Sequence, residues 1–289
     1  MKRIAAALML FTTIVVILYT QYEEEPERKG FTAYRLIAHA TGSIEDQYYT
    51  NTYDAMVENY KKGSRVFEID FMLSADRKVV ARHEWTKSMT EQLGQNAKLP
   101  EDKQAARLTR DEFINTPIQD KYQPMDVDKV LDLMERYPDI YIVTDTKEQK
   151  DEDIRHLFTE LVAAAKQRDL SLLDRVVVQI YNEPMLAMVK NVYPFESIIY
   201  TIYATQDSTN HIAQFVKENN IDAVTMPEYR VNPNFIAKLN RMDVATYVHT
   251  INDMSTVNNY EKWGVYGVYS DDITQPELEA NSLRYTLKR

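Results

Sequence analysis

Six titratable side chains stand at or near the C-terminal ends of short apolar runs between residues 35 and 147. They are His39, Glu68, Asp70, His83, Asp145 and Lys147. Glu68 and Asp70 lie two residues apart, so both side chains point to the same side of an extended chain. Asp145 and Lys147 have the same spacing. Two later runs carry polar side chains at the same end, Gln179 and His249.

These residue types suit chemistry on an anionic substrate. Three carboxylates in a chain without cysteine suit a hard divalent cation, Ca²⁺ or Mg²⁺. Two histidines flanking such an ion suit a general acid and a general base, and a lysine suits an anionic substrate group. His156 and His211 fall in helical stretches, and we interpret both as solvated or structural. For His249 the sequence identifies no partner.

Nine short apolar runs indicate the strands that would position these side chains. The runs span residues 35–40, 65–71, 78–84, 139–146, 175–180, 197–203, 222–227, 244–250 and 265–270. Most lack polar alternation, which is typical of parallel strands covered by helices on the outside. Helices are predicted between them at 52–62, 126–137, 151–168, 183–192, 209–220, 233–241 and 255–263.

Repeated strand–helix units over this length predict an α/β fold, a closed (β/α)8 TIM barrel. Because nine strands are predicted, at least one must lie outside a ring of eight. The active site of such a barrel lies at the C-terminal ends of its strands, so the side chains named above would converge on one mouth.

The chain is expected to comprise three parts. Residues 1–21 would be a signal anchor or signal peptide, residues 22–33 a solvated linker, and residues 34–289 the barrel. Within the barrel, residues 85–125 are polar and irregular and contain no clear strand. We interpret them as an inserted lobe over one end of the barrel.

An uncharged stretch near the N-terminus indicates membrane attachment. Residues 4–20 follow Lys2 and Arg3 and precede an acidic segment at 23–25. A bilayer span needs about 20 residues, with a lower limit near 17, and the charge asymmetry places the N-terminus in the cytoplasm. An N-terminal membrane anchor helix is favoured over a cleaved signal because no small-x-small cleavage site is evident. The body would then be membrane-anchored and extracytoplasmic; after signal cleavage it would instead be secreted.

Composition excludes several other classes. The 289-residue chain has a formal net charge of −10, so it lacks the basic surface that nucleic acid requires. The absence of cysteine excludes disulfides, thiol catalysis, cysteine zinc sites and lipoprotein attachment. The six glycines give neither of the common nucleotide-binding motifs.

Four groups of segments resemble motifs of the glycerophosphodiester phosphodiesterase family, a branch of the phospholipase-C-like barrel phosphodiesterases. IAHATG at 37–42 and TNT at 50–52 resemble I-A-H-R-G and E-N-T. FEIDF at 67–71, followed by His83-Glu84, resembles I-E-x-D-V followed by H-D. Residues 124–133 and DTK at 145–147 resemble P-x-L-x-E-V-L-x-L and E-x-K. HTIN at 249–252 and GVYGVYSD at 264–271 resemble W-T-V-N and G-V-D-G-I-x-T-D. The resemblance extends from about residue 35 to residue 274.

The resemblance implies a role for each of the six side chains. Glu68, Asp70 and Asp145 would hold the metal, while His39 and His83 would form the acid–base pair. Lys147 would bind the phosphate of a small-molecule or lipid-derived phosphodiester.

Four positions depart from the family motifs. Ala40 stands in place of the arginine that contacts phosphate, and Thr50 in place of the glutamate of E-N-T. Asp145 is shorter than the glutamate of E-x-K, so it would reach a metal only after a small shift. His249 replaces a tryptophan. The catalytic core is therefore kept, while the rim that contacts substrate differs.

The sequence predicts a metal-dependent phosphodiester hydrolase that acts outside the cytoplasm by His/His acid–base catalysis. One alternative is a phospholipase-C-like lyase that stops at a cyclic phosphate. Another is a non-catalytic binder of a phosphorylated polymer, which the missing arginine favours but the retained histidines and acids oppose.

The apolar stretch at 4–20 leads to a fractionation test. We expect full-length protein to sediment with membranes and to require detergent for release, with its body accessible to protease from outside the cell. Recovery in the cytosolic fraction without detergent would refute export. A mature N-terminus near residue 21 would instead support signal cleavage.

Overall fold

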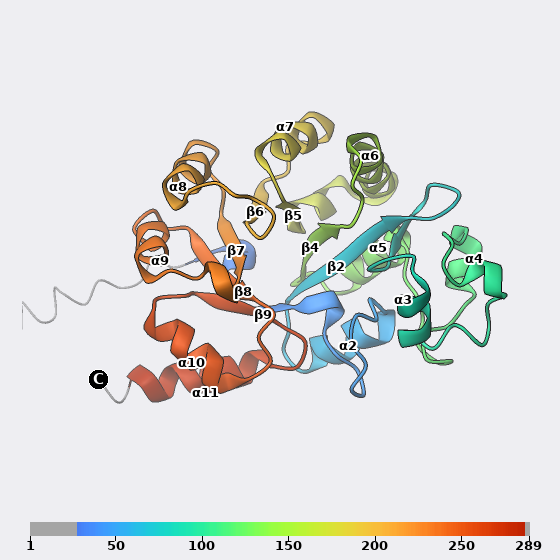
Figure 1. Ribbon diagram of the computed structural model, residues 1–289, viewed down its shortest axis with the longest axis horizontal. Helices are drawn as coiled ribbons and strands as arrows, with labels where there is room; N and C mark the ends of the chain where they lie inside the picture. Colours follow the sequence, from blue (N-terminus) through green and yellow to red (C-terminus); the bar gives the residue numbers. More distant parts are fainter. Residues whose placement is uncertain (1–27, 287–289) are drawn as a thin grey trace, which may run out of the picture.

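The computed structural model describes residues 28–286, which form a closed barrel of eight parallel strands (Figure 1). Around the ring these are β1 (Leu36–Ala38), β2 (Val66–Leu73), β4 (Tyr141–Thr146), β5 (Val176–Ile180), β6 (Ser197–Thr201), β7 (Ala223–Pro227), β8 (Ala245–His249) and β9 (Gly267–Ser270). Strand β1 closes the ring because it pairs with both β9 and β2. The predicted TIM barrel is therefore confirmed.

The ninth strand, β3 (Val79–Ala81), lies outside the ring and pairs antiparallel with the end of β2. The prediction that at least one strand lies outside the ring is confirmed, and the ring neighbours of β2 are β1 and β4. Parallel neighbours need a crossover of a dozen or more residues. Residues 74–78 provide only a turn, so the chain folds back on itself as a hairpin.

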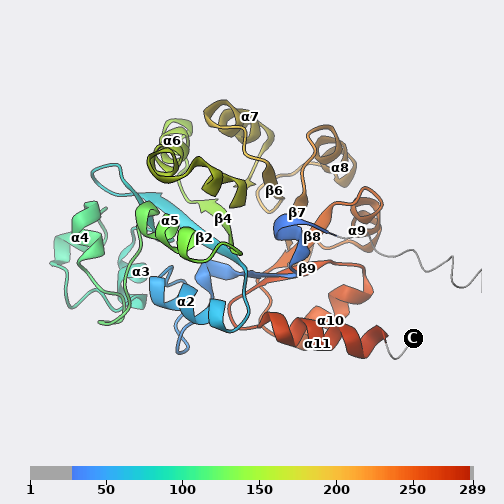
Figure 2. The same cartoon turned by 180° about the vertical axis from the view of Figure 1, so that it is seen from behind.

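Eight helices among the described residues follow strands or strand-end loops and surround the ring (Figure 2). They are α2 (Tyr53–Lys61), α5 (Val127–Arg136), α6 (Asp151–Arg168), α7 (Glu183–Val192), α8 (Thr209–Glu218), α9 (Pro233–Asn240), α10 (Met254–Lys262) and α11 (Gln275–Thr286). All but α11 were predicted. Six of them begin after a side chain that caps the first turn: Thr52, Asp126, Asn182, Ser208, Asn232 and Asp253.

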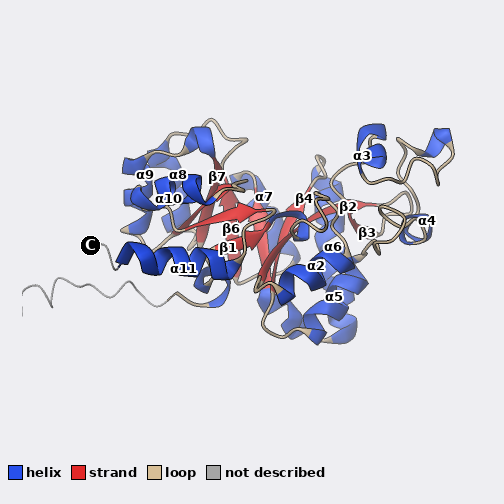
Figure 3. Cartoon of the chain, turned by 90° about the horizontal axis from the view of Figure 1, so that it is seen from below, coloured by secondary structure: helices blue, strands red, loops and turns tan. Residues whose placement is uncertain are grey.

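Residues 85–125 carry two short helices, α3 (Lys87–Gln92) and α4 (Arg110–Ile114), which lie to one side of the barrel beyond β3 (Figure 3). The buried Arg82 attaches this segment to the end of β3. Its guanidinium donates hydrogen bonds to Gln95 Oε1 at 2.8 Å and Thr90 Oγ1 at 3.0 Å. The segment is thus fixed directly beside His83, the next residue in the chain.

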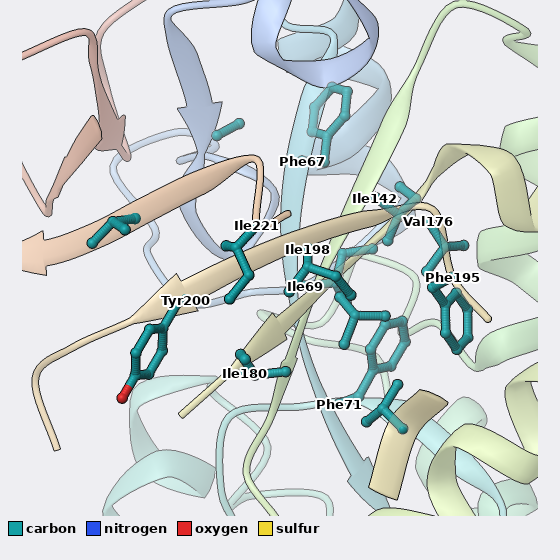
Figure 4. Close-up of a cluster of buried hydrophobic side chains, with 14 of the residues drawn as sticks. Phe67, Ile69, Phe71, Ile142, Val176, Ile180, Phe195, Ile198, Tyr200 and Ile221 are labelled. Carbon is teal, nitrogen blue, oxygen red and sulfur yellow. The ribbon is translucent and has the colours of Figure 1, made fainter. Parts of the chain in front are cut away.

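Side chains alternate between two cores along each ring strand. Phe67, Ile69 and Phe71 of β2 point outward into the layer between sheet and helices, where Figure 4 shows them with Ile198 and Tyr200. The intervening positions face the barrel interior, where a second apolar cluster lies. This cluster contains Val66, Val143, Val177, Ile199, Tyr247 and Tyr269.

The N-terminal end of the barrel is closed by close packing. Gly267 allows the β9 backbone to approach its neighbours, because a Cβ there would lie 2.2 Å from the Arg35 carbonyl oxygen and 2.7 Å from Tyr247. Phe31, in the short helix η1 (Gly30–Ala33), is buried in the same interior cluster. We expected residues 22–33 to be a solvated linker, but the aromatic ring of Phe31 makes their end part of the core.

The predicted anchor at residues 4–20 lies outside the described residues. Within residues 28–286, no helix is both long enough and apolar enough to cross a bilayer.

Candidate active site

Strand alternation sends the candidate side chains into one mouth. His39 lies two residues after Ile37, Glu68 and Asp70 follow Val66 on alternate positions, and Asp145 lies two residues after Val143. Ile37, Val66 and Val143 all belong to the interior cluster, so the residues with the same alternation also face inward. Asp70 and Asp145 are direct neighbours in the register of β2 and β4.

The three carboxylates form a group whose ligand atoms lie within 4.8 Å of one another. Glu68 Oε1, Asp70 Oδ1 and Asp145 Oδ1 are each buried and have no hydrogen-bond partner within the described part of the chain. Buried carboxylate oxygens are normally paired. Here Glu68 Oε1 and Asp145 Oδ1 have no partner among the described residues, and Asp70 Oδ1 faces only the Lys147 ammonium at 3.0 Å. Carboxylate oxygens gathered in this way match the ligands of a hard divalent cation, so this group could hold a metal ion.

Each carboxylate is held by a different partner. Asn51 bonds Asp70 twice, donating from Nδ2 to Oδ2 at 2.8 Å and accepting the Asp70 N–H at 3.0 Å. The Ala40 N–H donates to Glu68 Oε2 at 2.6 Å. Lys147 Nζ donates to Asp145 Oδ2 at 2.6 Å and forms an ion pair with Asp70 Oδ1 at 3.0 Å. These contacts leave one oxygen of Glu68 and one of Asp145 free of contacts. The third ligand, Asp70 Oδ1, is shared with Lys147.

Burial and mutual repulsion strain this group electrostatically. Burial, with the charge of Asp70, raises the pKa of Glu68 well above its ordinary value. Burial likewise raises the pKa of Asp145 to about 6, although Lys147 opposes the shift. For Asp70, Lys147 and the two histidines outweigh burial and lower the pKa. The neighbouring carboxylates raise the pKa of Lys147, which therefore stays charged.

His39 is oriented by Asp271, a residue that sequence reasoning did not single out. Asp271 Oδ1 lies 2.8 Å from His39 Nδ1, and Asn252 Nδ2 donates to Asp271 Oδ2 at 2.8 Å. Burial disfavours the charged form of His39. The bond to Asp271 and the charges of Glu68 and Asp70 outweigh this and raise its pKa to about 9. Asn252 and Asp271 lie within HTIN and GVYGVYSD, two segments that resemble family motifs. That resemblance was the feature of the sequence that could have identified them.

His83 reaches the mouth through the hairpin. The Arg82 N–H donates to the Asp70 carbonyl oxygen at 2.8 Å, which places the following residue beside the carboxylates. His83 Nδ1 is buried without a hydrogen-bond partner among residues 28–286. Burial lowers the pKa of His83, and Lys147 lowers it further, against the opposing charge of Asp70.

The rings of His39 and His83 both contact Tyr49. The Tyr49 ring centroid lies 5.0 Å from that of His39 and 5.1 Å from that of His83, with interplanar angles of 82° and 73°. The two histidines therefore share one side of the mouth with an aromatic residue between them.

The opposite side of the mouth is aromatic. Tyr181 and Tyr203 follow β5 and β6, and their rings pack edge to face at 5.8 Å. His249 ends β8 with its ring 6.4 Å from Tyr203, and its Nε2 is buried without a partner in the described chain. Burial lowers the pKa of His249 to about 4, so this imidazole is neutral. Tyr229, after β7, is 77% exposed at the rim.

The remaining predicted residues have other surroundings. Gln179 faces the interior and accepts a hydrogen bond from Tyr269 at 2.8 Å. His156 Nε2 lies 2.9 Å from the Arg77 carbonyl oxygen on the exterior. His211, in the first turn of α8, pairs with Glu183 of α7 at 2.7 Å on the exposed surface. Both fit the structural interpretation.

Comparison with known proteins identifies the family. The glycerophosphoryl diester phosphodiesterase family model matches residues 41–275. The chain belongs to this family. Membership makes it a phosphoric diester hydrolase of the glycerophosphodiester phosphodiesterase type, for which a small glycerophosphodiester is a fitting substrate. The match begins after His39, so the place of that residue rests on the geometry above. No curated protein matches the sequence.

Solved structures share the fold at low identity. A glycerophosphodiester phosphodiesterase from Parabacteroides distasonis is 16% identical with a TM-score of 0.67, over 88% of this chain and 98% of that one. An Oleispira antarctica phosphodiesterase, solved with the product sn-glycerol-3-phosphate, is 18% identical with a TM-score of 0.62, over 82% and 92%. A Thermotoga maritima glycerophosphodiester phosphodiesterase is 17% identical with a TM-score of 0.59, over 83% and 95%.

The strained carboxylates predict a pH-dependent effect of cations on stability. A raised folded-state pKa contributes stability that is complete below the unfolded value and lost as pH rises, here through about 6 for Asp145. Above that pH a divalent cation should relieve the repulsion. We expect Ca²⁺ or Mg²⁺ at a hundredfold excess over Kd to raise Tm by roughly 5–10 °C at about pH 7.5. The gain should shrink as protons compete below about pH 6.

Glu68→Gln is the matched control for this thermal measurement. The amide oxygen can still accept the Ala40 N–H, while one negative charge is removed. We expect the variant to lose the cation response without a lower Tm in chelator. An equal response to cations in both proteins would contradict a metal site at Glu68.

Proposed function

We propose that this chain is a metal-dependent phosphodiesterase that acts outside the cytoplasm, with His39 and His83 as its acid–base pair. The observation that carries the proposal is the group of three buried carboxylates whose ligand atoms lie within 4.8 Å, two of them with an oxygen that has no partner in the described chain, placed in the same mouth as two histidines. Glu68, Asp70 and Asp145 would hold the cation, Ca²⁺ or Mg²⁺. When bound, such an ion neutralises charge that develops on a phosphoryl oxygen.

The chain's own groups would move the protons. As an oxygen nucleophile bonds to phosphorus and the bond to the departing alcohol breaks, one histidine accepts the proton of the nucleophile. The other protonates the departing oxygen. Because Asp271 occupies Nδ1 of His39, the nitrogen left for substrate is Nε2. The opposite pKa shifts of the two rings suit one acid and one base.

Lys147 would bind the phosphate without leaving the carboxylates. An ammonium group has three donors. Contacts with Asp145 at 2.6 Å and Asp70 at 3.0 Å leave one donor for a substrate oxygen. Tyr203 and His249 would then face the alcohol portion of the diester, since they line the other side of the mouth.

The proposed location outside the cytoplasm rests on the sequence near the N-terminus. Residues 4–20, between Lys2-Arg3 and the acidic segment at 23–25, support an anchor that exposes the barrel on the extracytoplasmic side.

Hydrolysis of a panel of phosphodiesters, with and without chelator, tests the proposal. We expect turnover of at least one glycerophosphodiester, loss of turnover in chelator, and recovery on adding back Mg²⁺ or Ca²⁺. A cyclic phosphate as the final product would favour the phospholipase-C-like lyase. Binding of a phosphorylated polymer without turnover of any diester would favour the non-catalytic alternative, for which the alanine at position 40 is the supporting observation.

The histidine assignment has its own test. His39→Ala and His83→Ala should each lower turnover by roughly 10²-fold or more, because each removes a proton-transfer group. His156→Ala is the control, since His156 lies on the exterior, with its Nε2 beside the Arg77 carbonyl oxygen. Circular dichroism should show all three variants folded. Near-normal activity in both site variants, or a loss confined to His156→Ala, would refute the assignment.

A further inference from the structure

The position that follows His39 cannot contact a phosphate. Ala40 is fully buried, its backbone is left-handed with φ of 46°, and its N–H is used by Glu68 Oε2 at 2.6 Å. The family motif that this segment resembles has an arginine there. The phosphate site therefore lacks one donor, and Lys147 is already engaged by two carboxylates.

Tyr49 lies where such a donor is needed. Its ring is about 5 Å from both histidine rings, which approach it edge to face. The charged groups that act on its phenol are Asp271, Asp70, Lys147 and Glu68, all of them residues of the mouth. Burial and the three carboxylates raise the pKa of this phenol, so it is a neutral O–H donor at physiological pH.

The loop holds Tyr49 in this place at a cost in backbone energy. Tyr49 has φ of 58°, a left-handed conformation that is unfavourable for any residue other than glycine. Beyond the histidines, its ring packs against the apolar cluster of Ile44, Met89 and Tyr122. Two residues on, Asn51 is fastened to Asp70 through both of its side-chain polar atoms. Strain that is maintained by surrounding contacts is a feature of functional sites.

We propose that Tyr49 is a substrate-binding residue whose phenolic O–H donates a hydrogen bond to a phosphoryl oxygen between His39 and His83. It supplies the donor that is missing at Ala40. This inference takes the identity of the substrate from the proposed phosphodiesterase function. It assigns a phosphate contact to a residue outside the segment 37–42 that contains His39. A neutral phenol suits a site already crowded with charge, because it binds an anion without adding a further ion pair.

Tyr49→Phe removes the O–H and keeps the ring packing. With bis(p-nitrophenyl) phosphate and Mg²⁺, we expect kcat/KM to fall roughly 10–100-fold, the range for a hydrogen bond to a charged group. Tyr48→Phe is the matched control. Tyr48 is the adjacent tyrosine, and its O–H donates to Asp272 at the rim. Activity of Tyr49→Phe equal to that of the unaltered protein would overturn the proposal. Faster turnover would also overturn it, since Tyr49 would then obstruct the site.

Calorimetric binding of inorganic phosphate in the presence of Mg²⁺ separates this inference from the proposed function. We expect Tyr49→Phe to bind phosphate at least several-fold more weakly than the unaltered protein and Tyr48→Phe. If no diester is hydrolysed but this difference remains, the phosphate contact holds and the hydrolase proposal fails. Equal phosphate binding would overturn the contact while leaving hydrolysis intact. If the unaltered protein neither hydrolyses a diester nor binds phosphate, both proposals are overturned.

Discussion

The burial of three carboxylates at one point inside the barrel is the constraint on which the rest of the mouth depends. Like charges within 4.8 Å in a poorly solvated interior repel strongly, and each pays for its desolvation. The contacts around them are those that reduce this cost: the Lys147 ammonium, the Asn51 amide and the Ala40 N–H. They stabilise one oxygen of Glu68 and one of Asp145. The other oxygen of each has no partner within residues 28–286, and a cation would supply one.

The closed parallel ring explains how distant segments meet at this point. Inward positions recur every second residue, so any strand of the ring can send its last inward side chain to the same level. His39, directly after β1, and Asp271, directly after β9, are 232 residues apart, yet they form a 2.8 Å contact because β1 and β9 pair in the ring. The hairpin of β2 and β3 adds a side chain from outside the ring, and Arg82 fixes it through its bonds to residues 90 and 95.

Local sequence patterns were sufficient to predict the ring and its inward carboxylates, because strand periodicity alone fixes the side on which Glu68, Asp70 and Asp145 lie. They were insufficient where position depends on closure or on loops. The pairing of His39 with Asp271 exists only once the ring is closed. Which strand lies outside the ring was left open, although the short connection at 74–78 already excluded a parallel crossover before His83. The burial of Phe31 could not be seen in a segment that is otherwise polar. The catalytic and ligand roles of these residues remain predictions.

Left-handed backbone is concentrated around the first histidine and the loop that faces it. Ala40, Thr41, Tyr49 and Asn51 all have positive φ without being glycine, with values from 46° to 73°. Alanine, threonine and tyrosine have no local reason to adopt this conformation, so tertiary contacts must impose it. Those contacts converge on the carboxylates: Ala40 bonds Glu68, and Asn51 bonds Asp70. The energy gained by satisfying two buried anions thus offsets a backbone that the sequence alone would disfavour. The same backbone brings the rings of His39 and Tyr49 into contact on one side of the mouth.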